Sequence, residues 1–301
     1  MYSGPIIDAH THLWDLSMHR HGWLAPSAAS RGAVGAPDKI RRDCLPEDYL
    51  RASAGQGVVA SVHIEALWDR ADPVGETRWL ETLDKSHGVA VRYTAPAPLG
   101  TPGAAAVLAA QAAFPRVVGI RAVLSFHPAE PDKSFAAHGD IAADPAWQQD
   151  VARLVPLRLN LELMMYPYQL RPVLDLARSL PELQIIVNHC ASPVDRDADG
   201  MRRWREAVRQ LAAQPNIALK ISNIMAYNPQ ATFDDKRGIV LHCIDCFGPR
   251  RTMFASDWPV AAIHTTFGGI YDSFRRITAD LPAADQRAMF HDAARHFYRL
   301  D

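Results

Sequence analysis

Eight short apolar runs, rich in β-branched residues, recur along this chain of 301 residues, and segments with helical character separate most of them. The runs lie near residues 5–11, 58–66, 89–95, 117–124, 157–164, 184–189, 216–222 and 252–256. Strands that alternate with helices form parallel sheets, because each parallel connection must cross over the sheet. Eight such units predict a single-domain (β/α)8 TIM barrel over residues 1–301. An open doubly wound sheet is the alternative, but no Gly-x-Gly-x-x-Gly follows the first run.

The segments between the runs carry helix signals and two long loops. Residues 45–50 place a proline and two acids in a first helical turn, and Met201–Ala213 repeats apolar residues at spacings of three and four. Two segments lack such periodicity, Leu16–Arg42 after the first strand and His127–Asp144 after the fourth. In a barrel, loops that follow strands lie over the mouth where active sites form.

Composition and charge limit the classes of partner that the protein is expected to bind. Charged residues make up 22% of the chain and the formal net charge is −1, without basic or acidic blocks. This balance argues against nucleic acid or an anionic membrane as the main partner. No signal-peptide pattern and no membrane-spanning apolar run occurs, so we expect a cytoplasmic protein. In that compartment we expect structural thiols, including the Cys-x-x-Cys pair at 243 and 246, which lies in a helix-like segment.

Ionisable residues gather at the predicted strand ends. His10 and His12 alternate along the first strand, so their side chains share one face and can hold a divalent metal. In a barrel the carboxyl ends of all strands form one rim, so residues at different ends meet there. The other rim residues are Glu65, Arg121, Glu162, His189, Lys220 and Asp257. Two surface histidines and a helix N-cap aspartate are the plainer interpretations of His10, His12 and Asp257.

Three motifs carry a resemblance to a known family. Residues 8–14 (Asp-Ala-His-Thr-His-Leu-Trp), 188–193 (Asn-His-Cys-Ala-Ser-Pro) and 255–260 (Ala-Ser-Asp-Trp-Pro-Val) resemble the barrel amidohydrolases. The resemblance is closer to a branch of metal-dependent hydrolases that includes sugar-acid lactonases and 2-pyrone-4,6-dicarboxylate lactonase. Secondary matches lie at 41–49, 76–80, 119–121 and 215–222, so the resemblance spans nearly the whole chain in order.

The resemblance implies a metal site and a general base. His10 and His12 are the implied ligands, and Asp257 both ligates and activates water; Glu65 is either an extra ligand or a hydrogen-bond partner of one. Many members carry a ligand histidine on the fifth strand, which is absent here, and Arg121 stands where a bridging lysine would be needed. We therefore expect one divalent ion, with Zn²⁺ favoured. A metal-free site is the alternative, as in the dicarboxylate-lactonase relatives.

The remaining rim residues are expected to hold the substrate. His189 would polarise the scissile carbonyl or ligate a metal, and Arg121 or Lys220 would anchor a carboxylate or hydroxyl groups. A salt bridge from Arg121 to Glu162 or Glu65 is the competing interpretation. Further residues expected to contact substrate are Glu162, Tyr166, Trp23 and His264, with a packing role as the alternative for the loop residues.

The sequence thus predicts a hydrolase that opens the ring ester of a small polar lactone, either a sugar-acid or a carboxylated lactone. One alternative is a decarboxylase or hydratase of an unsaturated carboxylic acid on the same barrel, and another is a metal-independent lactonase. A barrel that has lost its chemistry is the third. Apolar residues near Phe267 and Tyr271 are compatible with a homodimer, although nothing requires one.

Overall fold

Eight parallel strands form one sheet in the computed structural model, which describes residues 1–26, 28 and 35–300. The strands are β1 (Ile6–Thr11), β2 (Val58–Ile64), β3 (Arg92–Pro96), β4 (Val117–Val123), β5 (Asn160–Met164), β6 (Ile185–Val187), β7 (Ile217–Ile221) and β8 (Thr252–Phe254). Each strand pairs with the next, and a parallel bridge between Thr11 and Trp258 joins the two ends of the sheet. The predicted (β/α)8 barrel is confirmed.

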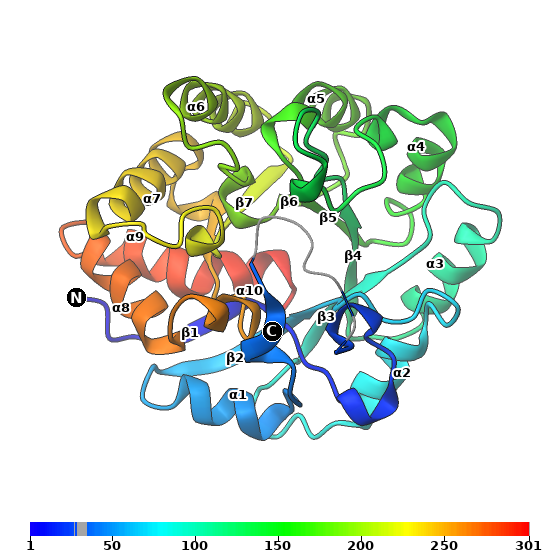
Figure 1. Cartoon of the computed structure of the whole chain (residues 1–301), viewed down its shortest axis with the longest axis horizontal. Coiled ribbons are helices and arrows are strands. Elements are labelled where there is room, and N and C mark those ends of the chain that lie inside the picture. Colours follow the sequence, from blue (N-terminus) through cyan, green and yellow to red (C-terminus); the bar gives the residue numbers. More distant parts are fainter. Residues whose placement is uncertain (27, 29–34, 301) are drawn as a thin grey trace.

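Helices surround the strands on the outside (Figure 1). They are α1 (Pro46–Ser53), α2 (Gly75–Thr82), α3 (Ala104–Ala112), α4 (Pro145–Ala152), α5 (Leu170–Ser179), α6 (Ala198–Ala212), α7 (Phe233–Phe247), α8 (Phe267–Ile277), α9 (Ala283–Arg287) and α10 (Ala293–Phe297). The helix α6 shows why these segments fold as they do. Asp197 caps its first turn by accepting from Gly200 N, and Trp204, Val208 and Leu211 are buried along one face.

Two strands begin later than the apolar pattern predicts. β3 starts at Arg92 rather than 89, and β5 starts at Asn160 rather than 157. Ala90 has φ +50° and Arg158 has φ +57°, and such left-handed residues interrupt an extended run. Hydrophobicity alone does not reveal these interruptions, because the segments 89–91 and 157–159 contain buried apolar residues although they are not extended strands.

The end of the chain closes the bottom of the barrel. A cluster of inward-facing strand residues, among them Ile7, Val62 and Ile186, packs against Phe297 and Tyr298. Tyr298 reaches into the barrel and donates a hydrogen bond to Glu162 Oε2 (2.9 Å). The sequence analysis did not anticipate this terminal helical segment.

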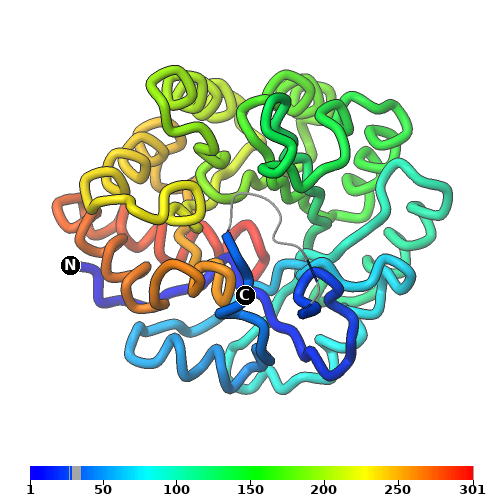
Figure 2. The backbone as a smooth tube through the Cα atoms, viewed as in Figure 1, coloured from blue at the N-terminus to red at the C-terminus, as the bar shows by residue number. Residues whose placement is uncertain are grey.

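Both predicted long loops follow their strands. The loop after β1 contains short 3₁₀ turns at Leu16–Met18, Gly22–Leu24 and Pro37–Ile40, while residues 27 and 29–34 lie outside the described residues. This dark-blue segment in Figure 2 lies against the loop after β2, where Trp23 Nε1 donates to Ala66 O (2.8 Å). The loop after β4 contains short turns at Pro131–Lys133 and Ile141–Ala143.

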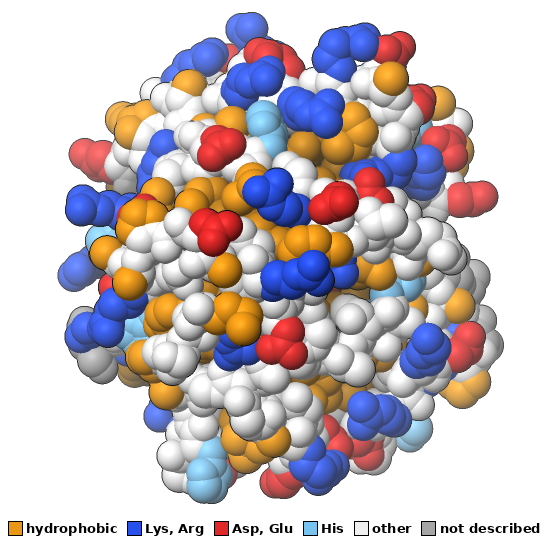
Figure 3. Space-filling model, turned by 90° about the vertical axis from the view of Figure 1, so that its left-hand side faces the viewer, with side chains coloured by type: hydrophobic (Ala, Val, Ile, Leu, Met, Phe, Trp, Pro, Cys, Tyr) orange, Lys and Arg blue, Asp and Glu red, His pale blue; other side chains and the backbone are white. Residues whose placement is uncertain are grey.

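The surface face in Figure 3 mixes both signs of charge with scattered apolar side chains. This face therefore offers no concentrated positive region of the kind that binds nucleic acid. Within the described ranges, no helix is both long and apolar enough to cross a membrane.

Candidate active site

Two histidines and one aspartate meet where β1 and β8 end. His10 Nε2 and His12 Nε2 lie 3.2 Å apart, and each lies 3.2 Å from Asp257 Oδ1. All three side chains are buried. The structure thus brings together the residues that the sequence places at opposite ends of the chain.

Asp8 holds this corner of the barrel together. Its Oδ1 accepts from Ser256 N (2.8 Å), and its Oδ2 accepts from Ser256 Oγ (2.6 Å) and Tyr49 OH (2.9 Å). Asp257 N then donates to His10 O (2.9 Å). Asp257 itself has φ +54°, a left-handed conformation that aspartate adopts more readily than most residues. The buried Asp8 carboxyl therefore fixes β8 to β1, and with it the distance between Asp257 and the histidines.

Hydrogen bonds to the other ring nitrogens orient both imidazoles. His12 Nδ1 lies 2.7 Å from the carbonyl oxygen of Ile64, so this nitrogen carries the proton and Nε2 presents a lone pair. His10 Nδ1 faces Lys220 Nζ (3.4 Å) and Glu162 Oε1 (3.8 Å). Burial, followed by the Lys220 charge, lowers the pKa of His10 well below its usual value, so its ring is neutral.

The three ligand atoms fit a divalent ion. Tetrahedral coordination with bonds of ~2.0 Å spaces ligand atoms about 3.3 Å apart, close to the three distances of 3.2 Å. Two neutral imidazoles and one carboxylate are a donor set that suits zinc. The second carboxylate oxygen, Asp257 Oδ2, is buried and has no hydrogen-bond partner in the described part of the chain. Buried polar atoms are rarely left so, and its orphaned state indicates that something else binds here.

His189 approaches the same cluster from β6. Its ring centroid lies 4.8 Å from that of His10, and its Nδ1 lies 2.8 Å from Ser222 Oγ at the end of β7. Burial lowers the pKa of His189 to about 4, although the Asp257 charge opposes this effect, so the ring is neutral at pH 7. Ser222 is not among the predicted site residues, although its place directly after the strand β7 is a signal in the sequence.

His189 is the first of four consecutive residues with left-handed backbone conformation. The φ angles of His189, Cys190, Ala191 and Ser192 are +53°, +57°, +53° and +49°. None is glycine, and each left-handed residue of this kind costs roughly 1–2 kcal/mol. Backbone strain of this size persists only where the surrounding structure enforces it, and it concentrates at functional sites.

Glu162 and Lys220 form the floor beneath the cluster. Lys220 pairs with Glu162, and both are fully buried. Asn188 Nδ2 (2.8 Å), Thr94 Oγ1 (3.1 Å) and Tyr298 OH complete the donors to Glu162. Burial lowers the pKa of Lys220 to about 8, against the opposing effect of Glu162. The structure thus places Glu162 in a fully bonded position, which differs from the expected contact with substrate.

Arg121 and Glu65 form a second buried pair on the rim. Arg121 Nη1 donates to Glu65 Oε1 (3.3 Å) and to Glu65 O (3.2 Å), while Glu65 Oε2 accepts from Leu67 N (2.8 Å). Both Glu65 oxygens are therefore engaged, and Glu65 lies outside the cluster of ligand atoms formed by His10, His12 and Asp257. Arg121 Nε is buried, and none of the described residues accepts a hydrogen bond from it. The salt-bridge interpretation of Arg121 holds, and its guanidinium retains an unused donor.

The expected loop contacts are only partly available. Tyr166 OH donates to Lys133 O (2.7 Å), and Trp23 Nε1 is bonded to Ala66 O, so both polar groups are engaged within the protein. His264 lies on the loop after β8, where a Cβ added to Gly35 would stand 3.2 Å from His264 Cε1. The loops after β1 and β8 therefore meet at His264.

A second group of metal-ligand types joins the loops after β4 and β6. His127 Nε2 donates to Asp195 Oδ1 (2.9 Å), and His127 Nδ1 accepts from Ala129 N and Glu130 N. Both ring nitrogens are thus engaged. This group connects two loops rather than offering a vacant ligand.

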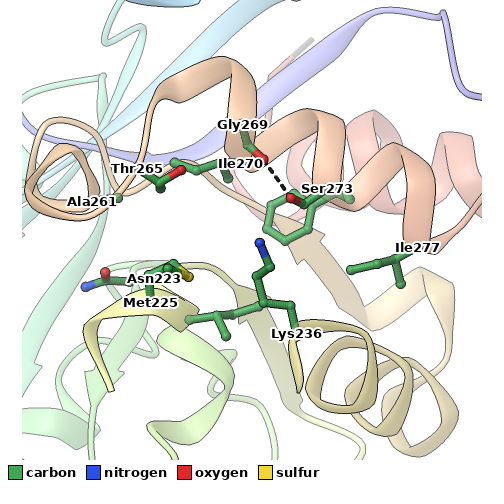
Figure 4. A pocket seen from close by; sticks show the side chains of 11 residues that line it. Asn223, Met225, Lys236, Ala261, Thr265, Gly269, Ile270, Ser273 and Ile277 are labelled. Atoms are coloured by element: carbon green, nitrogen blue, oxygen red, sulfur yellow. Dashed lines mark hydrogen bonds between the residues drawn. The ribbon is translucent and has the colours of Figure 1, made fainter. Parts of the chain in front are cut away.

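A small pocket of about 30 Å³ lies between α7, α8 and the loops after β7 and β8 (Figure 4). Lys236 extends into it from α7, and Ile224, Phe274 and Ile277 are among its apolar lining residues. No member of the His10, His12 and Asp257 cluster lines this cavity, so it is separate from the candidate active site.

The whole chain matches a known family. The model of the amidohydrolase family covers residues 7–300. The chain belongs to the amidohydrolase family. Protein y4mH of Sinorhizobium fredii is 33% identical over 295 residues, covering 98% of each chain. An L-fucono-1,5-lactonase of Burkholderia ambifaria is 28% identical over 300 residues, covering 98% of this amidohydrolase and 96% of the relative.

The same barrel occurs in a solved structure. An amidohydrolase from Burkholderia multivorans with bound zinc superposes with a TM-score of 0.81 at 23% identity, covering 98% of this chain and 99% of that one. At this identity the likeness supports the fold. The resemblance seen in the sequence motifs is therefore confirmed at the level of family and architecture.

Proposed function

We propose that this amidohydrolase is a lactonase that opens the ring ester of a small polar lactone. The observation that carries the proposal is the buried Asp257 carboxylate, which faces two imidazoles through one oxygen, while its other oxygen has no hydrogen-bond partner among the described residues. The neutral His189 ring lies beside His10 in the same cluster. Ester hydrolysis needs a base for water and a donor for the carbonyl oxygen, and this arrangement offers both. A lactonase among the relatives supports the choice of ester.

Asp257 is the proposed general base. Burial raises the pKa of Asp257, but the polar surroundings, the Arg121 charge among them, lower the pKa overall, so the group is a carboxylate at neutral pH. Its Oδ2 is the atom that takes the proton of the attacking water, because Oδ1 already faces both histidines.

His189 is the proposed donor to the carbonyl oxygen. When Ser222 Oγ donates to Nδ1, the neutral ring carries its proton on Nε2, the nitrogen left for substrate. A neutral donor of this kind strengthens its hydrogen bond as the carbonyl oxygen gains negative charge in the transition state. In this proposal Ser222 donates to Nδ1 and so favours the tautomer that His189 needs.

His10, His12 and Asp257 are the residues that would hold a divalent ion, with zinc preferred. When bound, such an ion acts as a Lewis acid toward the ester carbonyl and lowers the pKa of water. The Burkholderia multivorans amidohydrolase was solved with bound zinc, which supports this preference.

Arg121 is the proposed anchor for a carboxylate or hydroxyl group of the substrate. Its Nε is buried and has no partner within residues 1–26, 28 and 35–300, and Glu65 fixes the guanidinium through Nη1. We assign Lys220 and Glu162 to the support of His10, because both are fully buried and bonded to each other. Trp23, Tyr166 and His264 shape the mouth.

The test is a proton-release assay on a panel of aldonolactones and dicarboxylate lactones, with the ring-opened acid confirmed by mass spectrometry. Asp257→Asn serves as the matched control, because lactones also open spontaneously. Turnover by the wild type above that control on one class supports the proposal and names the substrate class. Activity that survives chelation points to a metal-independent lactonase.

The assay also separates the competing reaction. Silence on both lactone classes, together with carbon dioxide release from unsaturated carboxylic acids, would overturn the lactonase assignment in favour of a decarboxylase. Product analysis of the same acids by mass spectrometry detects hydration.

A further inference from the structure

Only a few internal hydrogen bonds stabilise the left-handed turn formed by residues 189–192. Its internal hydrogen bonds are Ala191 N to Asn188 O (3.0 Å) and Ser192 N to His189 O (2.8 Å). In L-residues with this conformation, Cβ lies close to the following carbonyl oxygen, so every residue of the turn is strained. The two internal hydrogen bonds are all that the turn itself offers against this strain. An external contact is therefore needed to keep the turn from relaxing.

Two aromatic side chains supply external hydrogen bonds. Trp204, on α6, donates from Nε1 to Cys190 O (2.7 Å), the carbonyl in the middle of the turn. Tyr227, on the loop after β7, donates from its hydroxyl to Ser192 Oγ (2.9 Å) at the end of the turn. Trp204 is 1% exposed and Tyr227 is 6% exposed, so neither bond competes with bulk water.

We infer that Trp204 and Tyr227 are positioning residues that hold the strained turn and thereby aim the His189 ring into the site. The inference rests on the proposed function, in which His189 donates to the carbonyl oxygen. Trp204 acts from the outer helical layer, where its ring packs beside His242 of α7 at 5.2 Å. Rotation of the peptide after Cys190 would change the backbone torsions that set the 2.8 Å contact between His189 Nδ1 and Ser222 Oγ.

The test compares Trp204→Phe with Trp147→Phe. Phenylalanine keeps an aromatic ring but removes the indole N–H, and Trp147 on α4 is 3% exposed without a hydrogen bond from its indole to a described residue. Loss of one buried hydrogen bond that aims a catalytic donor is expected to lower kcat of Trp204→Phe about tenfold, with KM nearly unchanged. Trp147→Phe should keep the wild-type kcat.

A second readout does not depend on turnover. The imidazole signals of His189, assigned by their loss in His189→Gln, are followed by proton–nitrogen NMR. They should shift in Trp204→Phe and Tyr227→Phe and stay in place in Trp147→Phe. Shifted signals in a protein that is inactive on lactones would support the positioning role and refute the proposed function.

The opposite result would overturn the inference. If both the His189 signals and kcat of Trp204→Phe match those of Trp147→Phe, the indole bond serves packing alone. If Trp204→Phe does not fold, Tyr227→Phe decides by the same two readouts, because it removes a single hydroxyl from the other end of the turn.

Discussion

On the β1–β8 side of the site, His10 stands on β1 and His12 directly beyond it, and Asp257 past β8 is a single left-handed residue. On the β6–β7 side, His189 begins a run of four left-handed residues. On the first side the Asp8 carboxyl accepts four hydrogen bonds, from His10 N, Ser256 N, Ser256 Oγ and Tyr49 OH. On the second side, indole and hydroxyl groups from neighbouring elements hold four residues with positive φ.

The difference separates two ways of placing a catalytic group. A strand fixes side-chain direction by its own pleat, so little else is needed beyond joining the strands. A strained turn is accurate only while its neighbours hold it. We therefore expect substitutions on the first side to abolish most of the activity, and substitutions on the second side to lower kcat by smaller factors.

The largest expected effect is a loss of folding stability when the buried Glu162–Lys220 pair, which forms the floor of both sides, is broken. Glu162→Ala leaves the Lys220 ammonium buried without its counterion, and removing one partner of a buried pair costs about 3–5 kcal/mol. Urea unfolding measures the loss. Replacing both partners with methionine should recover much of it, because the unpaired charge is then gone.

The matched control for the floor is Glu81→Ala. Glu81 pairs with Arg116 at the surface, where a salt bridge contributes at most about 1 kcal/mol. Equal losses of unfolding free energy in Glu162→Ala and Glu81→Ala would contradict the structural role assigned to the Glu162–Lys220 pair.

On the β1–β8 side, Asp257→Asn should lower kcat by at least about 100-fold, the scale on which a general base contributes. Asparagine keeps the shape of the side chain but cannot take the proton of water. Steady-state kinetics on the best lactone checks the expectation, with the unfolding midpoint as evidence that the fold is intact. Retained activity would remove Asp257 from its assigned role.

On the β6–β7 side, Ser222→Ala should lower kcat by a smaller factor, about tenfold, because His189 loses the partner that selects its tautomer but not the ring itself. Thr278→Val is the control, since Thr278 is equally buried and its Oγ1 donates to Phe274 O (2.8 Å) at the end of α8, away from the site. The comparison fails if the two variants lose activity equally.

The sequence predicted the strand-borne half of the site and missed what holds the other half. Period-two alternation predicted His10 and His12 on one face, and the end of β8 predicted Asp257 near them. In the structure the three side chains lie in contact, while their roles stay predictions. The left-handed turn could not be foreseen, because the four residues from His189 to Ser192 contain no glycine to signal positive φ.

Partners of buried charges were equally hidden from the sequence. Glu65, Arg121 and Glu162 lie at predicted strand ends, but only the closed barrel shows that Glu65 pairs with Arg121 and Glu162 with Lys220. Both pairs join alternate strands, β2 with β4 and β5 with β7, inside the closed barrel, and apolar patterns do not encode which residues meet there. The positions were therefore predictable, while the roles depended on contacts across the barrel.

The smallest expected effect concerns the contact between the loops after β4 and β6. Burial raises the pKa of Asp195, but hydrogen bonds from His127, Tyr168 and Arg203 outweigh it and lower the pKa overall. A carboxyl whose pKa is lower in the folded state stabilises the fold fully above its unfolded pKa of about 3.9, and this stability is lost as the pH falls through the folded pKa. Urea unfolding of wild type and Asp195→Asn between pH 7 and pH 3 should therefore converge toward the acid end.

The exposed Asp199 provides the control for this loop contact. It pairs with Arg202 one helical turn away and is largely open to water. Asp199→Asn should track the wild type at every pH, because screened surface pairs contribute little. If Asp195→Asn also tracks the wild type, the contact adds no stability, and the β6 side is held by Trp204 and Tyr227 without help from the loop after β4.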